Sequence, residues 1–235
     1  MLVISNYYTI ILSFFNILCF APDNRGILPL SQLVMSNHIQ KDEVLYIMSE
    51  DLLIKYCSPT LAGLKTGSMF PVEFDTHKEM VAAFKKFNAL LVKKGLRAIP
   101  LRKKTGRYLF YVFRPERLAK ELNCPEAQEI LCSNGYPEGN VSKCLACLMK
   151  RLASQVDFPH EIGLFLGYPP YDVKEFMLNK SIPKKIGYWK VYGDSEAAEK
   201  TFTKYDKCKR IYLSEYSKGK SLDQLIVSEP GKYNN

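Results

Sequence analysis

The stretch Arg97-Ala-Ile-Pro-Leu-Arg-Lys-Lys-Thr-Gly-Arg-Tyr-Leu-Phe-Tyr-Val-Phe-Arg114 decides the fold of this 235-residue chain. It holds two β-prone apolar runs, Arg97 to Arg102 and Arg107 to Arg114, separated by the polar residues 103–106. A short loop that contains glycine is typical of the connection in a hairpin. The stretch therefore predicts two adjacent antiparallel strands.

Helical patterns flank this hairpin on both sides. Upstream, residues 76–79 have the composition of a capping box, and Met80, Phe84, Phe87 and Leu91 follow at helical spacing. Downstream, prolines at first helical positions and periodic apolar residues predict helices over residues 115–122, 125–133, 141–155, 159–166 and 170–178. The hairpin is therefore expected to lie within a largely helical protein.

The last part of the pattern is one more strand and a long helix. Residues 186–192 are expected to form a strand, and Asp194 is expected to cap a helix with a buried face of Phe202, Tyr205, Cys208 and Tyr212. The predicted fold is α/β or α+β. It is a small three- to four-stranded mixed sheet that includes one antiparallel hairpin and is packed by several helices.

Residues 48–222 are expected to form a single globular domain, because no repeat, low-complexity tract or linker interrupts them. The apolar segment Ile10 to Phe20 is short for a membrane span, and no basic residue precedes it. We interpret residues 1–47 as a non-native or disordered extension upstream of a start at Met35 or Met48, with a membrane tether as the alternative. Residues 223–235 are expected to be a frayed tail.

Composition limits the class of protein more than its function. An apolar fraction of 47% is sufficient for a buried core. The formal charge of +9 attracts anions in general, whether nucleic acid, a phosphorylated ligand or an acidic surface. The seven cysteines lie mostly in apolar runs, which favours reduced thiols in the cytoplasm.

Three stretches together carry a resemblance to a known family. They are Tyr56-Cys-Ser-Pro-Thr-Leu-Ala-Gly-Leu-Lys65, Phe158-Pro-His-Glu-Ile-Gly-Leu-Phe-Leu-Gly-Tyr-Pro-Pro-Tyr-Asp-Val173 and Gly187-Tyr-Trp-Lys-Val-Tyr-Gly-Asp194. The chain resembles the domain of unknown function 3793 family, a group of uncharacterised bacterial proteins, from about Met48 to Leu222. The resemblance implies no activity, substrate or cofactor.

Cys57 and His160 are the candidate catalytic pair. Ser58 and Pro59 have the composition of a helix start, so Cys57 is expected at the N-terminal end of a short helix over residues 61–65, where a thiol has a lowered pKa. With His160 as base and Glu161 or Asp172 as orienting carboxylate, Cys57 would act as a nucleophile. In the alternative interpretation, Cys57 is a small buried side chain and His160 only begins a helix.

Lys65, Tyr188 and Lys190 are the candidate ligand-binding residues. The run 187–192 interleaves aromatic side chains with Lys190, as platforms for single-stranded nucleic acid do, although an ordinary half-buried strand shows the same alternation. Basic residues also cluster within 93–107 and 200–210, where they could form an anion-binding surface. No motif for reading bases accompanies them.

No metal site is expected. His160-Glu161 lacks the second histidine of a zinc protease, because position 164 is Leu. Cys144 and Cys147 have the spacing of zinc ligands, with Cys124 and Cys132 as potential partners, but the first two lie within an amphipathic helical pattern.

Two main functional hypotheses follow. The first is a cytoplasmic enzyme or small-ligand-binding protein with a Cys/His-containing site. The alternative is a non-catalytic binding module that uses its basic surfaces for nucleic acid or an acidic protein partner. A third hypothesis is an interaction protein in which Cys57 and His160 serve packing alone. The sequence specifies no cofactor and no oligomeric state.

Overall fold

A computed structural model describes residues 49–104, 107–154 and 158–228. The extension predicted for residues 1–47 lies outside the described residues, as do residues 229–235 of the predicted tail. Thr105 and Gly106, at the tip of the predicted hairpin, lie outside them as well.

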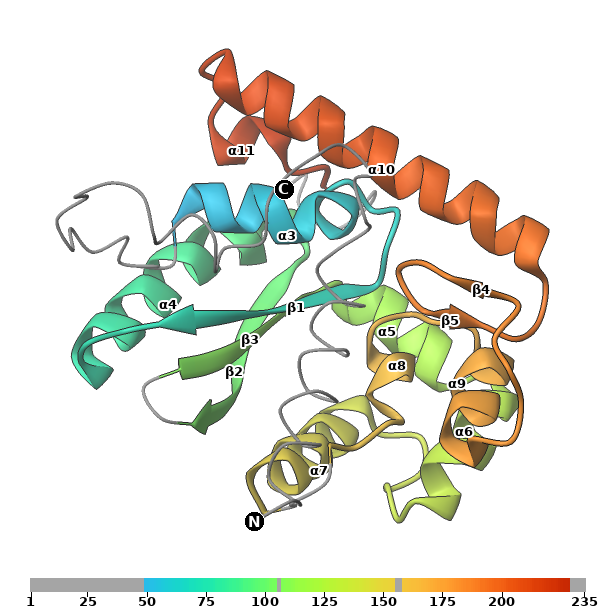
Figure 1. Ribbon diagram of the computed structural model, residues 1–235. Coiled ribbons are helices and arrows are strands. Elements are labelled where there is room, and N and C mark those ends of the chain that lie inside the picture. The colour runs from blue at the N-terminus through green and yellow to red at the C-terminus, as the bar shows by residue number, and fades with distance from the viewer. Residues whose placement is uncertain (1–48, 105–106, 155–157, 229–235) are drawn as a thin grey trace, which may run out of the picture.

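The centre of the fold is an antiparallel sheet with the strand order β1-β3-β2 (Figure 1). The predicted hairpin is confirmed as β2, Arg97–Lys104, and β3, Arg107–Phe113, which pair with a bulge between Pro100 and Arg102. The remaining strand, β1 (Gly67–Glu73), pairs with β3 and was not predicted. Its glycine, serine and proline have low β propensity, so its pattern resembles a loop.

The sheet is buried on both faces. Along β3, Tyr108, Phe110 and Val112 belong to one core cluster, whereas Tyr111 and Phe113 belong to the other. Successive side chains of a strand point to opposite faces, so a strand covered on both sides has an unbroken apolar run. This explains the composition of residues 108–113.

The first face of the sheet is covered by α3 (Glu50–Leu61) and α4 (His77–Leu91), the latter followed by the 3-10 turn η1 (Val92–Lys94). The predicted cap of α4 is confirmed, because the Thr76 hydroxyl accepts a hydrogen bond from the Glu79 backbone N–H at 3.2 Å. Phe87 and Leu91 are buried in the cluster that also contains Phe70 and Phe110 of the sheet.

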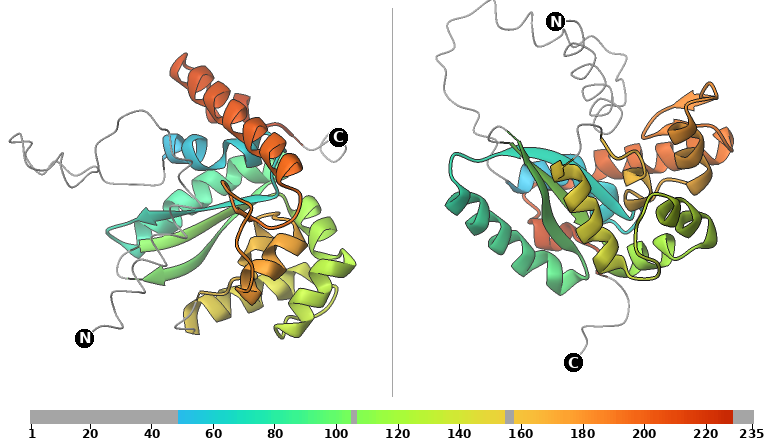
Figure 2. Two further views of the ribbon diagram at one scale, coloured as in Figure 1. Left: turned by 45° about the vertical axis from the view of Figure 1, so that its right-hand side comes forward. Right: turned by 90° about the horizontal axis from the view of Figure 1, so that it is seen from below.

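The opposite face is covered by a second group of helices. Figure 2 shows α4 and α7 on opposite sides of the sheet. The predicted helices over residues 115–122, 125–133 and 170–178 are confirmed with the same bounds. The five helices of this group are α5 (Pro115–Leu122), α6 (Pro125–Ser133), α7 (Val141–Ser154), α8 (Ile162–Phe165) and α9 (Pro170–Leu178).

The strand predicted over residues 186–192 is wrong as a single element. The chain instead forms a two-stranded hairpin of β4 (Lys185–Ile186) and β5 (Lys190–Val191). Its turn is closed by a hydrogen bond from the Gly187 N–H to the Trp189 carbonyl at 3.0 Å. Gly187 lies directly against the Phe202 ring, where a Cβ atom would overlap that ring, so the close packing of the turn requires glycine.

The long helix α10 (Ser195–Ser217) is confirmed together with its cap. The Asp194 carboxylate accepts hydrogen bonds from the backbone N–H groups of Glu196 and Ala197, each at 3.0 Å. The predicted buried face is confirmed and spans both core clusters. Burial raises the pKa of the Cys208 thiol to about 11, which keeps this thiol protonated at neutral pH.

The chain remains packed beyond residue 222. Helix α11 (Leu222–Leu225) has a reciprocal capping box between Ser221 and Gln224. Ile226 is buried, and the Val227 N–H donates to the Leu61 carbonyl at 3.0 Å. The tail predicted from residue 223 is therefore wrong through residue 228, because the apolar side chains that follow Gly219 pack against α3.

The predicted fold class, a small sheet packed by several helices, is confirmed. Where a mixed sheet was expected, all pairings among the described strands are antiparallel. No helix in the described part of the chain combines the length and the apolar character needed to cross a membrane.

Candidate functional site

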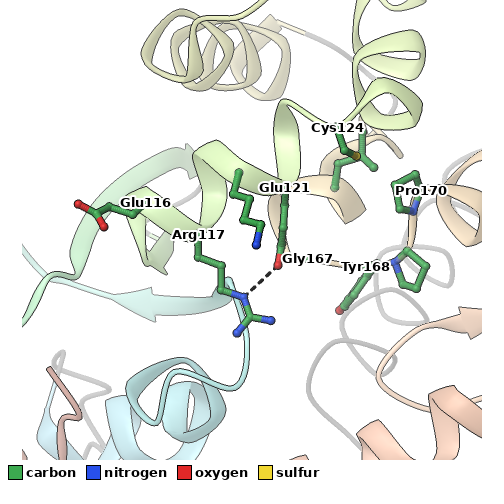
Figure 3. A pocket seen from close by; sticks show the side chains of 10 residues that line it. Glu116, Arg117, Glu121, Cys124, Gly167, Tyr168 and Pro170 are labelled. Carbon is green, nitrogen blue, oxygen red and sulfur yellow. Dashed lines mark hydrogen bonds and ion pairs between the residues drawn. The ribbon is translucent and has the colours of Figure 1, made fainter. Parts of the chain in front are cut away.

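A pocket of about 900 Å³ opens between α5 and the loop that joins α8 to α9 (Figure 3). One wall comes from the polar face of α5, whose apolar face buries Leu118 and Leu122. The other wall comes from the loop, whose tight turn at Gly167 brings Tyr168 to the pocket. The lining residues are Glu116, Arg117, Lys120, Glu121, Cys124, Leu164, Gly167, Tyr168, Pro169 and Pro170.

The α5 wall contains an ion pair between two residues that are one helical turn apart. Arg117 Nε lies 2.9 Å from Glu121 Oε1, and Arg117 Nη1 donates to the Gly63 carbonyl at 2.7 Å. The second oxygen of the Glu121 carboxylate accepts a hydrogen bond from the Thr66 hydroxyl. These contacts connect α5 to the segment after α3 and fix the side chains of Arg117 and Glu121.

Gly167 allows the loop to approach this wall closely. Its φ of +77° lies in the left-handed region, and a Cβ atom would lie 2.5 Å from Thr66 Oγ1 and 2.9 Å from Glu121 Oε2. A side chain at this position would be strained and would also displace the Thr66–Glu121 hydrogen bond. Gly167 therefore ends α8 and also shapes the pocket.

The pKa values of two buried tyrosines are raised, mainly by burial and to a smaller extent by the nearby Glu121 carboxylate. Burial raises the pKa of Tyr205 to about 12, with Arg117 lowering it and Glu121 raising it to smaller extents. Burial, followed by the charge of Glu121, raises the pKa of Tyr111 well above its usual value. Both phenols are therefore neutral at physiological pH and can act as hydrogen-bond donors.

Tyr168 is part of the loop wall, is mostly buried and connects distant segments of the chain. The Lys65 ammonium lies 5.3 Å from the centroid of the Tyr168 ring, and the Trp189 ring centroid lies 5.2 Å from the same centroid. The three residues come from the three stretches that carry the family resemblance. All three stretches therefore meet at Tyr168, which lines the pocket.

A comparison with protein families matches residues 53–226, most of the described chain, to a family described as "Protein of unknown function (DUF3793)". The chain belongs to the DUF3793 family. Neither the curated proteins nor the solved structures contain a match to it.

Cys57 of this DUF3793 chain lies elsewhere than predicted. It is fully buried in the second half of α3, within the cluster that packs on the first face of the sheet. Ser58 and Pro59 lie inside this helix, which begins eight residues earlier with Ser49 as its cap. The C-terminal half of a helix carries the negative end of the dipole, so the argument for a lowered thiol pKa at Cys57 is lost.

The difference in burial predicts a specific pattern of thiol labelling. In the native protein, iodoacetamide is expected to react with the partly exposed Cys124 and the exposed Cys132, and to react with Cys57 at least about 100-fold more slowly, because Cys57 must first be uncovered by local unfolding. Mass spectrometry of peptides labelled with and without urea measures these rates. Native labelling of Cys57 as fast as that of Cys132 would restore the nucleophile hypothesis.

His160 and Lys190 do come together, around Phe176 of α9. The His160 and Phe176 rings meet edge to face with their centroids 5.0 Å apart, and Lys190 Nζ lies 5.1 Å from the Phe176 centroid. Tyr188, the aromatic residue among the ligand-binding candidates, packs instead against α10, where its hydroxyl donates to Asp206 at 2.8 Å. The interleaved run thus supplies separate contacts and no continuous stacking platform.

The two candidate carboxylates each hold loops together. Glu161, with 2% of its side chain exposed, accepts a hydrogen bond from the Tyr136 hydroxyl at 2.9 Å and forms an ion pair with Arg151 at 2.9 Å. Asp172 accepts hydrogen bonds from the Trp189 indole and from two backbone N–H groups of the segment after β5. The contacts described for both carboxylates are therefore those of buried structural groups.

The basic clusters are partly neutralised within the fold. Lys94 pairs with Asp223 at 3.3 Å, and Lys200 pairs with Glu196 at 2.7 Å. Arg107 forms an ion pair with Glu73 across the edge of the sheet. The anion-binding surface predicted from the sequence thus has fewer unpaired charges than the composition indicates.

For metal ions, the cysteines expected as alternative ligands have other contacts. The Cys144 thiol donates to the Pro137 carbonyl at 3.1 Å. Among the residues that the structure describes, no three histidine, cysteine or acidic side chains are grouped as metal ligands.

The sequence did not identify Arg117, Glu121 and Cys124 as site residues. A signal was present for Cys124, which precedes Pro125 and lies at the N-terminal end of α6, the kind of position that was expected for Cys57. The four-residue spacing of Arg117 and Glu121 was also visible, but such pairs are common on solvated helical faces. Only the loop at residues 167–170 makes this face the wall of a pocket.

Proposed function

We propose that the protein binds a small ligand in the pocket between α5 and the α8–α9 loop. The observation that carries this proposal is the packing of Lys65 and Trp189 against Tyr168, which lines the pocket; each of the three comes from a different stretch of family resemblance. The pocket also has the ordinary composition of a ligand site, with apolar surface from Leu164 and Tyr168 and a few fixed polar groups on α5.

We further propose that this binding takes place in the bacterial cytoplasm. The support is chemical, because the six cysteines of the described residues are all thiols, and thiols persist in a reducing compartment. Fractionation of cells that express the protein at its natural level tests this part, with recovery in the periplasmic or secreted fraction as the contradicting result.

Cys124 provides a reporter for the test of ligand binding. A panel of small metabolites is first screened for compounds that raise the melting temperature of the full chain. A true ligand present at about 100 times its Kd is expected to stabilise the folded state by about 2.7 kcal/mol. Because Cys124 lines the pocket, the same compound is expected to slow the alkylation of Cys124 and to leave that of Cys132 unchanged.

A variant that fills the pocket is the control. Cys124→Trp places a large ring at a partly exposed N-cap position whose side chain makes no capping hydrogen bond, so the fold is expected to tolerate it. The stabilisation by the ligand is expected to disappear in this variant. A compound that stabilises both proteins equally and does not protect Cys124 would bind elsewhere and would contradict the proposal.

A further inference from the structure

We infer that the ligand is an organic anion with a flat apolar body, an inference that rests on the proposed function. The anionic group is expected to contact Lys120, and the flat body is expected to lie against Tyr168 and the two prolines of the loop.

Four charged side chains line the pocket, the cations Arg117 and Lys120 and the carboxylates Glu116 and Glu121, and Lys120 is the one that we expect to contact an anion. Arg117 and Glu121 neutralise each other at 2.9 Å, and the Thr66 hydroxyl occupies the remaining carboxylate oxygen. Lys120 lies on the same helix face, is exposed, and forms no ion pair with any residue that the structure describes. Its ammonium is thus the cation of this wall that is available to a ligand.

A second positive charge lies behind the loop wall. Lys65 is only 6% exposed, and its ammonium lies 5.3 Å from the Tyr168 centroid. This ammonium lies over the ring of Tyr168, and Tyr168 itself lines the pocket. The formal charge of +9 for the chain favours the approach of anions further.

The loop wall favours a flat apolar group. The Tyr168 ring is held from behind by the Trp189 ring at 5.2 Å, and Trp189 is itself fixed by its hydrogen bond to Asp172 at 2.7 Å. Pro169 and Pro170 follow directly and have little conformational freedom. Rigid aromatic and proline surfaces lose little entropy when a planar group packs on them.

Two fluorescent probes with the same ring system distinguish the contribution of the ligand's charge to binding from that of its apolar body. Anilinonaphthalene sulfonate is an anion, whereas N-phenylnaphthylamine has the same rings and no charge. We titrate each probe into the full chain, the Lys120→Gln variant and the Cys124→Trp variant. Lys78→Gln is the matched control, because Lys78 is exposed on α4, across the sheet from the pocket, and has no ion pair among the described residues.

The sulfonate is expected to bind more tightly than the neutral probe, and Lys120→Gln is expected to weaken it roughly threefold to tenfold while Lys78→Gln leaves it unchanged. Added salt is expected to weaken only the sulfonate, because ions screen an exposed charge pair. Binding that remains in the Cys124→Trp variant measures probe bound outside the pocket and is subtracted.

The possible outcomes separate the inference from the proposed function. If both probes bind equally, are lost in Cys124→Trp and do not respond to Lys120→Gln, the pocket binds ligands but the anionic class is wrong. If neither probe is lost in Cys124→Trp, the pocket is not the binding site and the proposed function fails together with this inference. Thermal unfolding of each variant shows that a loss of binding is not a loss of the fold.

Discussion

Replacing Arg114 by methionine is expected to lower the free energy of unfolding by about 3–5 kcal/mol. The Arg114 guanidinium is 2% exposed and donates to the carbonyls of Thr60 and Leu61 at 2.8 Å, and to that of Val227 at 2.7 Å. Two of these carbonyls lie at the C-terminal end of α3, where Thr60 also accepts from the Gly63 N–H at 3.1 Å and Leu61 from the Val227 N–H at 3.0 Å. Methionine fills a similar volume and leaves all three carbonyls buried without this donor.

Urea unfolding followed by circular dichroism measures this loss. Arg114→Lys is expected to be intermediate, because an ammonium keeps the charge but cannot reproduce the planar fork of the guanidinium. Arg210→Met, at an exposed position of α10, is the matched control and is expected to change stability by less than about 0.5 kcal/mol. Equal stability of the Arg114 and Arg210 variants would show that the contact with Val227 does not hold the C-terminal segment.

Replacing Asp172 by alanine is expected to cost roughly 3 kcal/mol and to expose Trp189. Asp172 is 4% exposed, and its carboxylate accepts hydrogen bonds from Trp189 Nε1 at 2.7 Å and from the N–H groups of Tyr192 and Gly193 at 2.8 Å. Alanine leaves these donors buried without their acceptor. Because Trp189 supports Tyr168, the pocket wall is expected to loosen as well.

Trp189 is the only tryptophan in the chain, so fluorescence reports on this position directly. Under conditions in which the Asp172→Ala variant is folded, its tryptophan emission is expected to shift to longer wavelength. Binding of the fluorescent probes in the pocket is expected to weaken. Asp172→Asn keeps one acceptor oxygen and is expected to show a smaller loss. Asp75→Ala, at an exposed position, is the control; the same emission and stability in both alanine variants would contradict the structural role of Asp172.

The elements that the sequence predicted correctly are those whose boundaries depend on nearby residues. Pro115, Pro125 and Pro170 begin helices α5, α6 and α9 because proline suits the first helical position. The hairpin of β2 and β3 follows from two apolar runs joined by a short polar loop. In each of these elements the favourable local conformation and the buried position agree.

The errors occurred where packing between distant segments outweighs a local signal. Ser58 and Pro59 have the composition of a helix start, yet α3 runs through them. The helix begins after Ser49 because its side chains Leu52, Leu53 and Ile54 are buried against the sheet. This gain in buried apolar surface exceeds the cost of one missing backbone hydrogen bond at Pro59.

The sequence by itself determined most of the helices, the central hairpin and the family. The tertiary structure alone decided which residues form the candidate site, because its walls join segments far apart in the chain. Arg117 contacts Gly63 across 54 positions, and Thr66 contacts Glu121 across 55. Caps, turns and periodicity act over a few residues, whereas the burial of both faces of the sheet brings these segments together, and no local pattern encodes which ones meet.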